Sequence, residues 1–205
     1  MPKLTAEQAL QRLKQGNQLF VSEHHAVIEI DINRRAELAK AQEPFAIILG
    51  CSDSRVPAEL IFNQGLGDLF VIRIAGNIVA PSQIGSIEFA ADQFGTRLVV
   101  VLGHSSCGAI QASLDHILTN SEHASPNLES IVSRITPCIK SVVTEKEYPN
   151  EAARMKAAVR ANIHASVEQL RHGSEILENL IANDDLLIVG AEYDLETGAI
   201  EFFDE

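Results

Sequence analysis

Short, nearly continuous apolar runs alternate with longer amphipathic stretches through most of this chain. The runs are rich in β-branched residues and cover residues 45–49, 69–74, 98–102 and 186–189. Such runs are typical of strands covered on both faces, as in a parallel sheet. Between them, residues 86–94, 109–118 and 151–171 follow a helical pattern. This alternation predicts an α/β fold: a mostly parallel central β-sheet flanked by helices and joined by right-handed crossovers.

The first forty-one residues follow a different pattern. Apolar positions recur with helical spacing over 5–20, and Thr5 with Gln8 has the sequence of a capping box. A second, shorter helix is expected over 33–41. Neither helix contains a group of reactive side chains. We therefore expect residues 1–41 to form a helical arm that packs against the body of the protein or on a partner subunit.

Two prolines in the segment 121–150 have different expected effects. Ser125 and Pro126 look like a helix start, with proline at the first helical position. Pro137 is then expected to kink or end that helix. No repeat, low-complexity tract or linker divides the sequence, so residues 1–205 are predicted to form one domain with its α/β core in 42–205.

Composition narrows the class of protein. A chain of 205 residues with 46% apolar content can bury a full core, and three cysteines do not suggest a disulfide scaffold. The net charge is −12, with 28 acids against 16 Lys plus Arg and no dense basic block, which argues against nucleic-acid binding. The apolar runs are too short to cross a membrane, and we see no leader, so a cytoplasmic protein is expected. A small neutral substrate would not feel this negative field, whereas an anion would need a local cation.

Reactive side chains gather where two of the apolar runs end. Cys51 begins Cys-Ser-Asp-Ser-Arg after the first run, and His104 and Cys107 lie in His-Ser-Ser-Cys-Gly after the third. Two thiols and an imidazole are a ligand set for zinc with one position left to fill, and water there would make the site catalytic. A lone Cys or His is usually only a core residue, but that does not explain three of them at equivalent strand ends. Cys138, next to Pro137 and without such partners, is expected to be structural.

Two further residues of the first motif are candidates for chemistry. Asp53 and Arg55 alternate with Cys51, so their side chains should face the same way. A carboxylate beside a guanidinium is held ionised and oriented. The alternative is a surface ion pair that contributes almost nothing. Because Asp53 and Arg55 lie close to the expected metal ligands, a functional role for the pair is favoured over a surface ion pair.

Together, Cys-x-Asp-x-Arg followed by His-x-x-Cys-Gly resembles the signature of the β-class carbonic anhydrases. The similarity is strong over 42–110, including Val-Ile-Arg-Ile-Ala-Gly-Asn at 71–77, and returns weakly at 190–194. The resemblance implies reversible hydration of carbon dioxide to bicarbonate and a proton, by a hydroxide on one zinc ion (Zn²⁺) per subunit. It implies Cys51, His104 and Cys107 as the protein ligands of that zinc.

The resemblance also implies that Asp53 and Arg55 form a gate. In the open state Arg55 holds Asp53 away from the metal, and Asp53 accepts a hydrogen bond from the zinc-bound hydroxide. In the closed state Asp53 is the fourth zinc ligand, and we expect lower pH to favour this state. Two thiolates already offset the charge of the ion, so the bound water should be less acidic than beside three imidazoles. Activity should then rise on the alkaline side of neutrality.

Other positions match the substrate site of the family. Gln42 matches a glutamine that reaches the active site of the neighbouring subunit, which implies a homo-oligomer, either a dimer or a tetramer. Phe70, Ala75 and Phe89 match positions in the apolar wall of the pocket. The backbone N–H of Gly108, near the start of a helix, is placed to help hold an anionic product.

One feature of some bacterial members is matched only in part by this sequence. Those members are inhibited by bicarbonate in a side pocket made by Trp, Arg and Tyr. Arg73 and Tyr193 match two of these positions, but Ile48 stands where the subgroup has tryptophan, and the chain contains no Trp. The resemblance therefore does not predict bicarbonate inhibition through this pocket.

Two other functions are compatible with the same residues. The zinc hydroxide could act on carbon disulfide or carbonyl sulfide, to which members of this fold have been adapted by changes in the access channel. Alternatively, the zinc could be purely structural, with Asp53 as a permanent fourth ligand. Arg55 and Gln42 would then have no obvious role.

Overall fold

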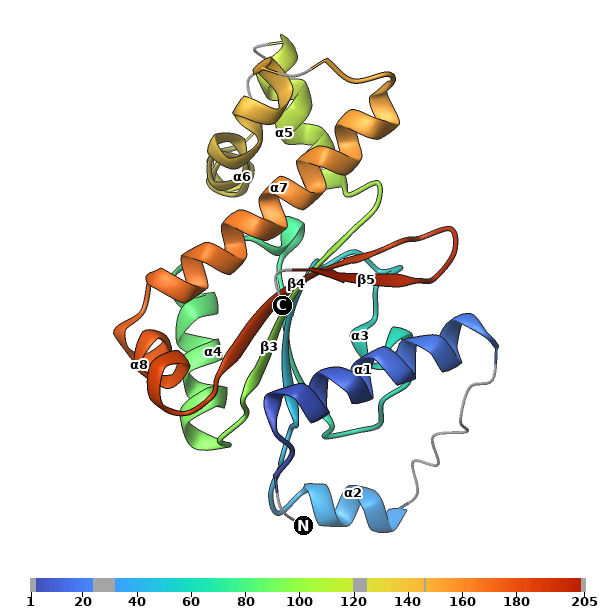
Figure 1. The fold of residues 1–205 in the computed structure, drawn as a ribbon, viewed down its shortest axis with the longest axis vertical. Coiled ribbons are helices and arrows are strands. Elements are labelled where there is room, and N and C mark those ends of the chain that lie inside the picture. The colour runs from blue at the N-terminus through green and yellow to red at the C-terminus, as the bar shows by residue number, and fades with distance from the viewer. Residues whose placement is uncertain (1–2, 24–31, 120–124, 146, 204–205) are drawn as a thin grey trace.

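Five strands form one sheet in the computed structural model, which describes residues 3–23, 32–119, 125–145 and 147–203. The strands are β1 (Ala46–Gly50), β2 (Leu69–Arg73), β3 (Leu98–His104), β4 (Leu187–Tyr193) and β5 (Ile200–Phe203). They lie in the order β2-β1-β3-β4-β5, and all neighbours are parallel except β4 and β5. The predicted α/β class with a mostly parallel sheet is confirmed (Figure 1).

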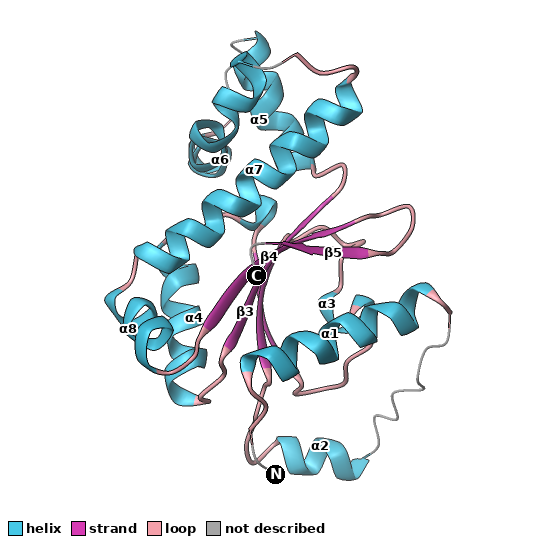
Figure 2. Cartoon of the chain, viewed as in Figure 1, coloured by secondary structure: helices cyan, strands magenta, loops and turns pink. Residues whose placement is uncertain are grey.

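Helices cover both faces of this sheet (Figure 2). They are α1 (Ala6–Val21), α2 (Ile32–Leu38), α3 (Ala58–Ile61), α4 (Pro81–Gln93), α5 (Gly108–Thr119), α6 (Pro126–Glu145), α7 (Glu151–His172) and α8 (Glu175–Asn183), with a 3₁₀ turn, η1 (Ala75–Asn77). The strands separate two apolar clusters: α4, α7 and α8 pack on one face, and α1 and α3 on the other. Ile47 and Leu49 face the first cluster and Ile48 the second, which explains why the run is continuously apolar. Helices α5 and α6 pack on each other and on one end of α7.

The N-terminal helix α1 begins with the predicted capping box. The Thr5 hydroxyl accepts from the Gln8 N–H, and the Gln8 side chain accepts from the Thr5 N–H. Its apolar face, which includes Leu10 and Leu13, is buried on the α3 side of the chain's own sheet. The arm thus packs against the body, one of the two expected arrangements. Packing of its outer side on a partner subunit stays a prediction.

Several element boundaries differ from the sequence prediction. Helix α6 runs through Pro137 without ending there, and α8, capped by Ser174, was not predicted. Strand β4 extends past residue 189 because it stays paired with β3 as far as Tyr193. This part of β4 contains Glu192, a charged residue that interrupts the apolar run. Its carboxylate is neutralised by Arg160 of α7 at 2.7 Å, so the strand stays buried.

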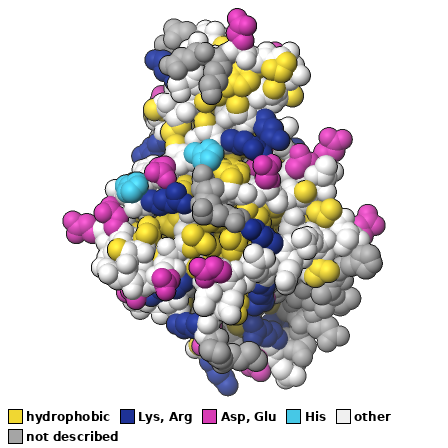
Figure 3. All heavy atoms as spheres, in the orientation of Figure 1, with side chains coloured by type: hydrophobic (Ala, Val, Ile, Leu, Met, Phe, Trp, Pro, Cys, Tyr) yellow, Lys and Arg dark blue, Asp and Glu magenta, His cyan; other side chains and the backbone are white. Residues whose placement is uncertain are grey.

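Charged side chains are scattered over the face of the molecule seen in Figure 3, with acidic groups mostly toward its outline. Within the described residues, no helix is both long and apolar enough to cross a bilayer. The parallel strands β1 and β3 lie side by side at the centre of the sheet. Because parallel strands end at the same edge, the residues that follow β1 and those that end β3 are brought together there.

Candidate metal centre

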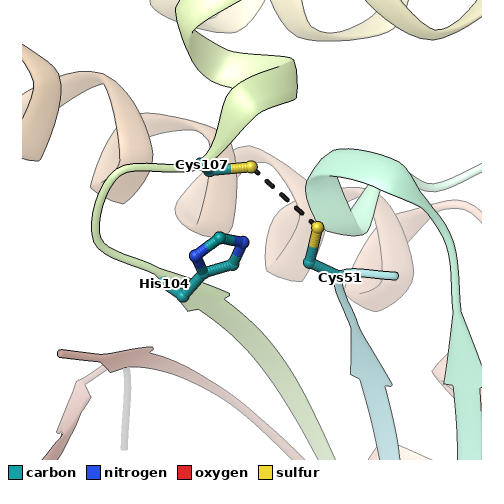
Figure 4. Close-up of side chains that lie close together, drawn as sticks. All are labelled: Cys51, His104 and Cys107. Carbon is teal, nitrogen blue, oxygen red and sulfur yellow. Dashed lines mark hydrogen bonds between the residues drawn. The ribbon is translucent and has the colours of Figure 1, made fainter. Parts of the chain in front are cut away.

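The two motifs meet at the carboxyl edge of the sheet. Cys51 follows the last residue of β1, His104 is the last residue of β3, and Cys107 directly precedes α5. Gly50 pairs with Leu102 across the two strands, and this register brings Cys51 level with Gly103, the residue before His104. The three side chains converge from these separate elements on one point (Figure 4).

The geometry of these side chains suits a tetrahedral metal ion. One ligand atom from each lies within 4.8 Å of the others, and all three residues are buried. The sulfur atoms of Cys51 and Cys107 are 4.0 Å apart. Two sulfurs bound tetrahedrally to zinc at about 2.3 Å would be about 3.8 Å apart. A zinc ion would therefore fit between these sulfurs with little rearrangement.

The imidazole of His104 is prepared for a ligand by its hydrogen bonding. Its Nδ1 lies 2.9 Å from the backbone oxygen of Ser105, to which it donates. That bond leaves a lone pair on Nε2, which is buried and has no hydrogen-bond partner among the described residues. A backbone carbonyl that fixes the tautomer in this way is typical of histidines that bind metals. The unpartnered nitrogen is explained if a cation occupies the site.

The two thiols also fit a cation electrostatically. The hydrogen bond from Cys107 lowers the pKa of Cys51 to about 4, outweighing the opposing effect of burial. The same bond, together with burial, raises the pKa of Cys107 well above its ordinary value. One thiolate therefore forms readily, but two thiolates at this distance need a compensating positive charge. A divalent ion supplies that charge, and binding it would release the second proton.

Asp53 and Arg55 form a bidentate pair at the rim of the metal centre. Arg55 Nε lies 2.9 Å from Asp53 Oδ1, and Arg55 Nη2 lies 2.7 Å from Asp53 Oδ2. The Arg55 backbone N–H also donates to Oδ1. These bonds hold the pKa of Asp53 well below its ordinary value. Asp53 Oδ2 is 3.8 Å from His104 Nε2, and the Asp53 side chain is only 17% exposed, so this is not an ordinary surface pair.

Arg73 supports the same loop from β2. Its Nε donates to the Cys51 carbonyl at 3.0 Å and its Nη2 to the Asp53 carbonyl at 2.5 Å. Tyr193 is buried at the end of β4, in register with His104, and β1 and β3 lie between the strands of Arg73 and Tyr193. Ile48 is fully buried in the cluster that contains Tyr193. Arg73 thus binds the backbone of the Cys51 loop, and the structure adds no support for an anion pocket.

Three predicted substrate positions lie at the opposite, amino edge of the sheet. Phe70 pairs with Ile47, four residues before Cys51, or about 13 Å along the strand. Phe89 lies 6.4 Å from Phe70 between ring centres, and both contact Phe94. Gln42 and Phe94 line a common hollow of about 670 Å³. The structure does not bring Gln42, Phe70 or Phe89 to the metal centre of their own chain.

The other two predicted positions do lie beside the metal centre. Ala75 begins η1, whose next residue, Gly76, donates its N–H to Cys51 Sγ at 3.4 Å. Gly108 follows Cys107 at the start of α5. Apart from its chain neighbours and the backbone of its own helix, no atom of the described residues lies within 4 Å of the position that a side chain would take there. Cys138 is half-buried on α6 and donates to the Arg134 carbonyl. The sequence motifs predicted no role for Gly76, although it lies in the segment that carries the family resemblance.

A mostly parallel sheet with two buried thiols and one imidazole at its carboxyl edge defines a metal-binding α/β protein. Residues 46–200 match the family model described as carbonic anhydrase. A carbonic anhydrase of Mycolicibacterium smegmatis is 38% identical over 201 residues, which are 98% of this chain and 95% of that protein. The chain belongs to the carbonic anhydrase family.

Solved structures place it in the β-class. The β-carbonic anhydrase CcaA superposes with a TM-score of 0.78 at 26% identity, covering 95% of each chain. A tetrameric β-carbonic anhydrase of the fungus Sordaria macrospora superposes with a TM-score of 0.76 at 24% identity, covering 96% of each chain. The second similarity concerns the fold alone. The recognition drawn from the two motifs is confirmed.

Proposed function

We propose that this protein catalyses the reversible hydration of carbon dioxide to bicarbonate and a proton, with one zinc ion per subunit. The observation that supports this most directly is the convergence of three buried ligand atoms, one of which is the unpartnered Nε2 of His104. Cys51, His104 and Cys107 would hold the ion. Zinc in such a site supplies an acidified water molecule as nucleophile.

The chain's own residues orient the reaction around this centre. Asp53 is ionised and held by the Arg55 fork, so it can accept a hydrogen bond at the edge of the ligand set. Arg73 fixes the backbone carbonyls on either side of Ser52, which keeps the Cys51 and Asp53 side chains in place. The Arg55 pairing also argues against the structural-zinc alternative, in which Asp53 would be a permanent ligand.

Carbon dioxide hydration by stopped-flow at alkaline pH tests this function. The zinc-loaded protein should hydrate carbon dioxide far above the background rate, and Cys51→Ser should abolish the gain. A rate at background for a fully zinc-loaded protein would leave the structural-zinc alternative. The other alternative is hydrolysis of carbon disulfide or carbonyl sulfide, and it is tested by comparing the turnover of these gases with that of carbon dioxide. Faster turnover of either would overturn the assignment of carbon dioxide as substrate.

The Asp53–Arg55 pair is proposed to be a gate. The structure has the pairing expected of the open state, with Arg55 holding the carboxylate. In the closed state Asp53 would leave Arg55 and bind the metal, an exchange that lower pH favours. Asn is a poor zinc ligand, so Asp53→Asn should lose the acidic limb of the pH–rate profile while remaining zinc-loaded. An unchanged profile would refute the gate.

We further propose that the active unit is at least a dimer. Gln42, Phe70 and Phe89 lie at the amino edge of the sheet, so they can serve a metal centre only in another subunit. Phe89 is 53% exposed, and Phe70 and Phe94 extend the same aromatic surface. A second copy that placed its carboxyl edge against this surface would close both metal centres with apolar side chains.

Mixing two defective variants tests this arrangement. Cys51→Ser has no intact metal centre but keeps Gln42, and Gln42→Ala keeps the metal centre. If Gln42 acts across the interface, mixed dimers contain one complete site, and activity should exceed the sum of the separate variants. Cys51→Ser mixed with Cys107→Ser is the control, because both defects lie in the same ligand set. No gain in the first mixture would contradict the proposal, and sedimentation distinguishes dimer from tetramer.

A cytoplasmic location is part of the same proposal. Cys51 and Cys107 are free thiols in this structure, and both are needed as metal ligands. Thiols are kept reduced in the cytosol, whereas oxidising compartments favour disulfides.

A further inference from the structure

A short left-handed turn directs a backbone N–H onto the sulfur of Cys51. Gly76 donates to Cys51 Sγ at 3.4 Å from within η1. Gly76 and the following Asn77 both have positive φ, 68° and 43°. This is an uncommon conformation for a residue other than glycine, and two in succession require support from their surroundings.

Two buried polar side chains of α7 bind the carbonyls of this turn. Asn162 Nδ2 donates to the Gly76 oxygen at 2.8 Å, and Ser166 Oγ donates to the Asn77 oxygen at 3.3 Å. Asn162 is 3% exposed and Ser166 is 4% exposed. They are four residues apart and therefore share one face of the helix. The other residues of that buried face are apolar: Ala158, Val159, Ile163, Val167 and Leu170. Polar groups are costly in such a face unless they are paired, and the two carbonyls provide the pairing.

Helix α7 also contacts the segment that carries the histidine ligand. Gly103 precedes His104 in β3, and a side-chain carbon at Gly103 would lie 2.5 Å from Ile163 Cδ1. Asn162 and Ile163 therefore touch the backbones next to both sides of the metal centre. One rigid helix fixes the position of η1 relative to the end of β3.

Given the zinc enzyme proposed above, we propose that Asn162 and Ser166 are positioning residues for the Cys51 thiolate. By fixing the carbonyls of Gly76 and Asn77, they keep the Gly76 N–H directed at the sulfur. A hydrogen bond to a metal thiolate withdraws electron density from it, so the sulfur donates less to the ion. The ion then remains a stronger acid toward its other ligands.

Cobalt(II) substitution in the full-length protein provides a readout independent of carbon dioxide turnover. Thiolate ligands give a sulfur-to-cobalt charge-transfer absorption whose energy reports on the sulfur lone pair. In Asn162→Ala the band should shift to lower energy, because the lone pair loses its hydrogen bond. Metal affinity should fall roughly 10-fold, as for other residues that support a metal ligand.

Ser166 offers a matched pair of variants, and Val167 offers a control on the same helix. Ser166→Ala should shift the band in the same direction as Asn162→Ala. Ser166→Thr, which keeps the hydroxyl, should have the band at the wild-type energy. Val167→Ala removes a fully buried side chain of α7 without touching the turn. It should lower the stability of the protein and leave the band and the metal affinity unchanged.

These measurements separate a positioning role from a merely structural one. If Asn162→Ala and Ser166→Ala lose stability but keep the wild-type band and affinity, the proposed role is overturned. Should Asn162→Ala fail to fold, the comparison of Ser166→Ala with Ser166→Thr decides the question. A wild-type protein without any thiolate band would instead refute the zinc site itself.

Discussion

Gly103 is the position where a single methyl group should disturb the metal centre most directly. A β-carbon there would lie 2.5 Å from Ile163 Cδ1 and 2.7 Å from Ile163 Cγ1, and both distances are shorter than van der Waals contact allows. Overpacking a core costs about 1–3 kcal/mol. Gly→Ala regains roughly 0.4–1 kcal/mol through the unfolded state, because Gly103 does not have a positive φ. Gly103→Ala should therefore destabilise the protein by about 1–2 kcal/mol.

The destabilisation by Gly103→Ala should depend on the side chain of Ile163, and the substitution should also weaken zinc binding. Ile163→Ala alone creates a cavity worth about 2–5 kcal/mol. With Gly103→Ala the new methyl enters that cavity, so the double variant should be more stable than the sum of the single effects by about 1–2 kcal/mol. Backbone movement at residue 103 would displace His104, and zinc affinity of the single Gly103→Ala variant should fall roughly 10-fold.

Urea denaturation and zinc competition with a chromophoric chelator measure both effects. Gly85→Ala is the control, because no atom of the described residues outside the neighbouring backbone of α4 lies within 4 Å of the new carbon. That change should raise stability by up to about 1 kcal/mol and leave zinc affinity unchanged. Additive effects of Gly103→Ala and Ile163→Ala would refute the contact. Unchanged zinc affinity in a destabilised Gly103→Ala would refute its link to His104.

Three further outcomes follow from other parts of the structure. Arg160→Ala leaves the buried carboxylate of Glu192 unpaired and should cost about 3 kcal/mol in urea denaturation; adding Glu192→Gln should recover most of it, and no recovery would contradict the pairing. Hydrogen bonds from the Thr197 N–H and hydroxyl lower the pKa of Asp194, so its stabilising effect is present above the unfolded-state pKa and is lost as pH falls. The stability lost in Asp194→Ala should accordingly shrink as the pH falls below the unfolded-state value of about 3.9, and a loss independent of pH would exclude this cause. In chelator-treated protein the hydrogen bond from Cys107 lowers the pKa of Cys51, so one thiol per chain should react with iodoacetamide at pH 6, where an ordinary thiol barely reacts, and bound zinc should block that reaction.

The parts of the site that the sequence predicted are those set by local pattern. Apolar runs mark the central strands because both faces of a parallel sheet are buried. The ends of those runs place Cys51 and His104 at one edge. The parts that were not predicted have weak local signals. Strand β5 is a four-residue edge strand, and the apolar run of β4 ends before Gly190 although the strand continues through Glu192 to Tyr193.

Other features depend on contacts between residues that are distant in the chain. Asn162 reaches Gly76 across 86 positions, and nothing near either residue indicates that they meet. Likewise, the family match relates Gln42 to a metal centre, but only the sheet shows that Gln42 lies at the opposite edge from its own Cys51. Strand direction decides this, because β1 separates the two residues along its full length.

The sequence alone determined the fold class, the family and the residues that offer ligands to a metal. These properties depend on residue types and on short spacings along the chain, and both can be taken directly from the sequence. Only the tertiary structure decided how the ligands are held. It shows which nitrogen of His104 is left for a metal and that Arg55 binds the Asp53 carboxylate. It also shows that α7 holds η1, the turn that donates to Cys51. Such hydrogen bonds depend on where separate elements pack, and packing is a property of the whole folded chain.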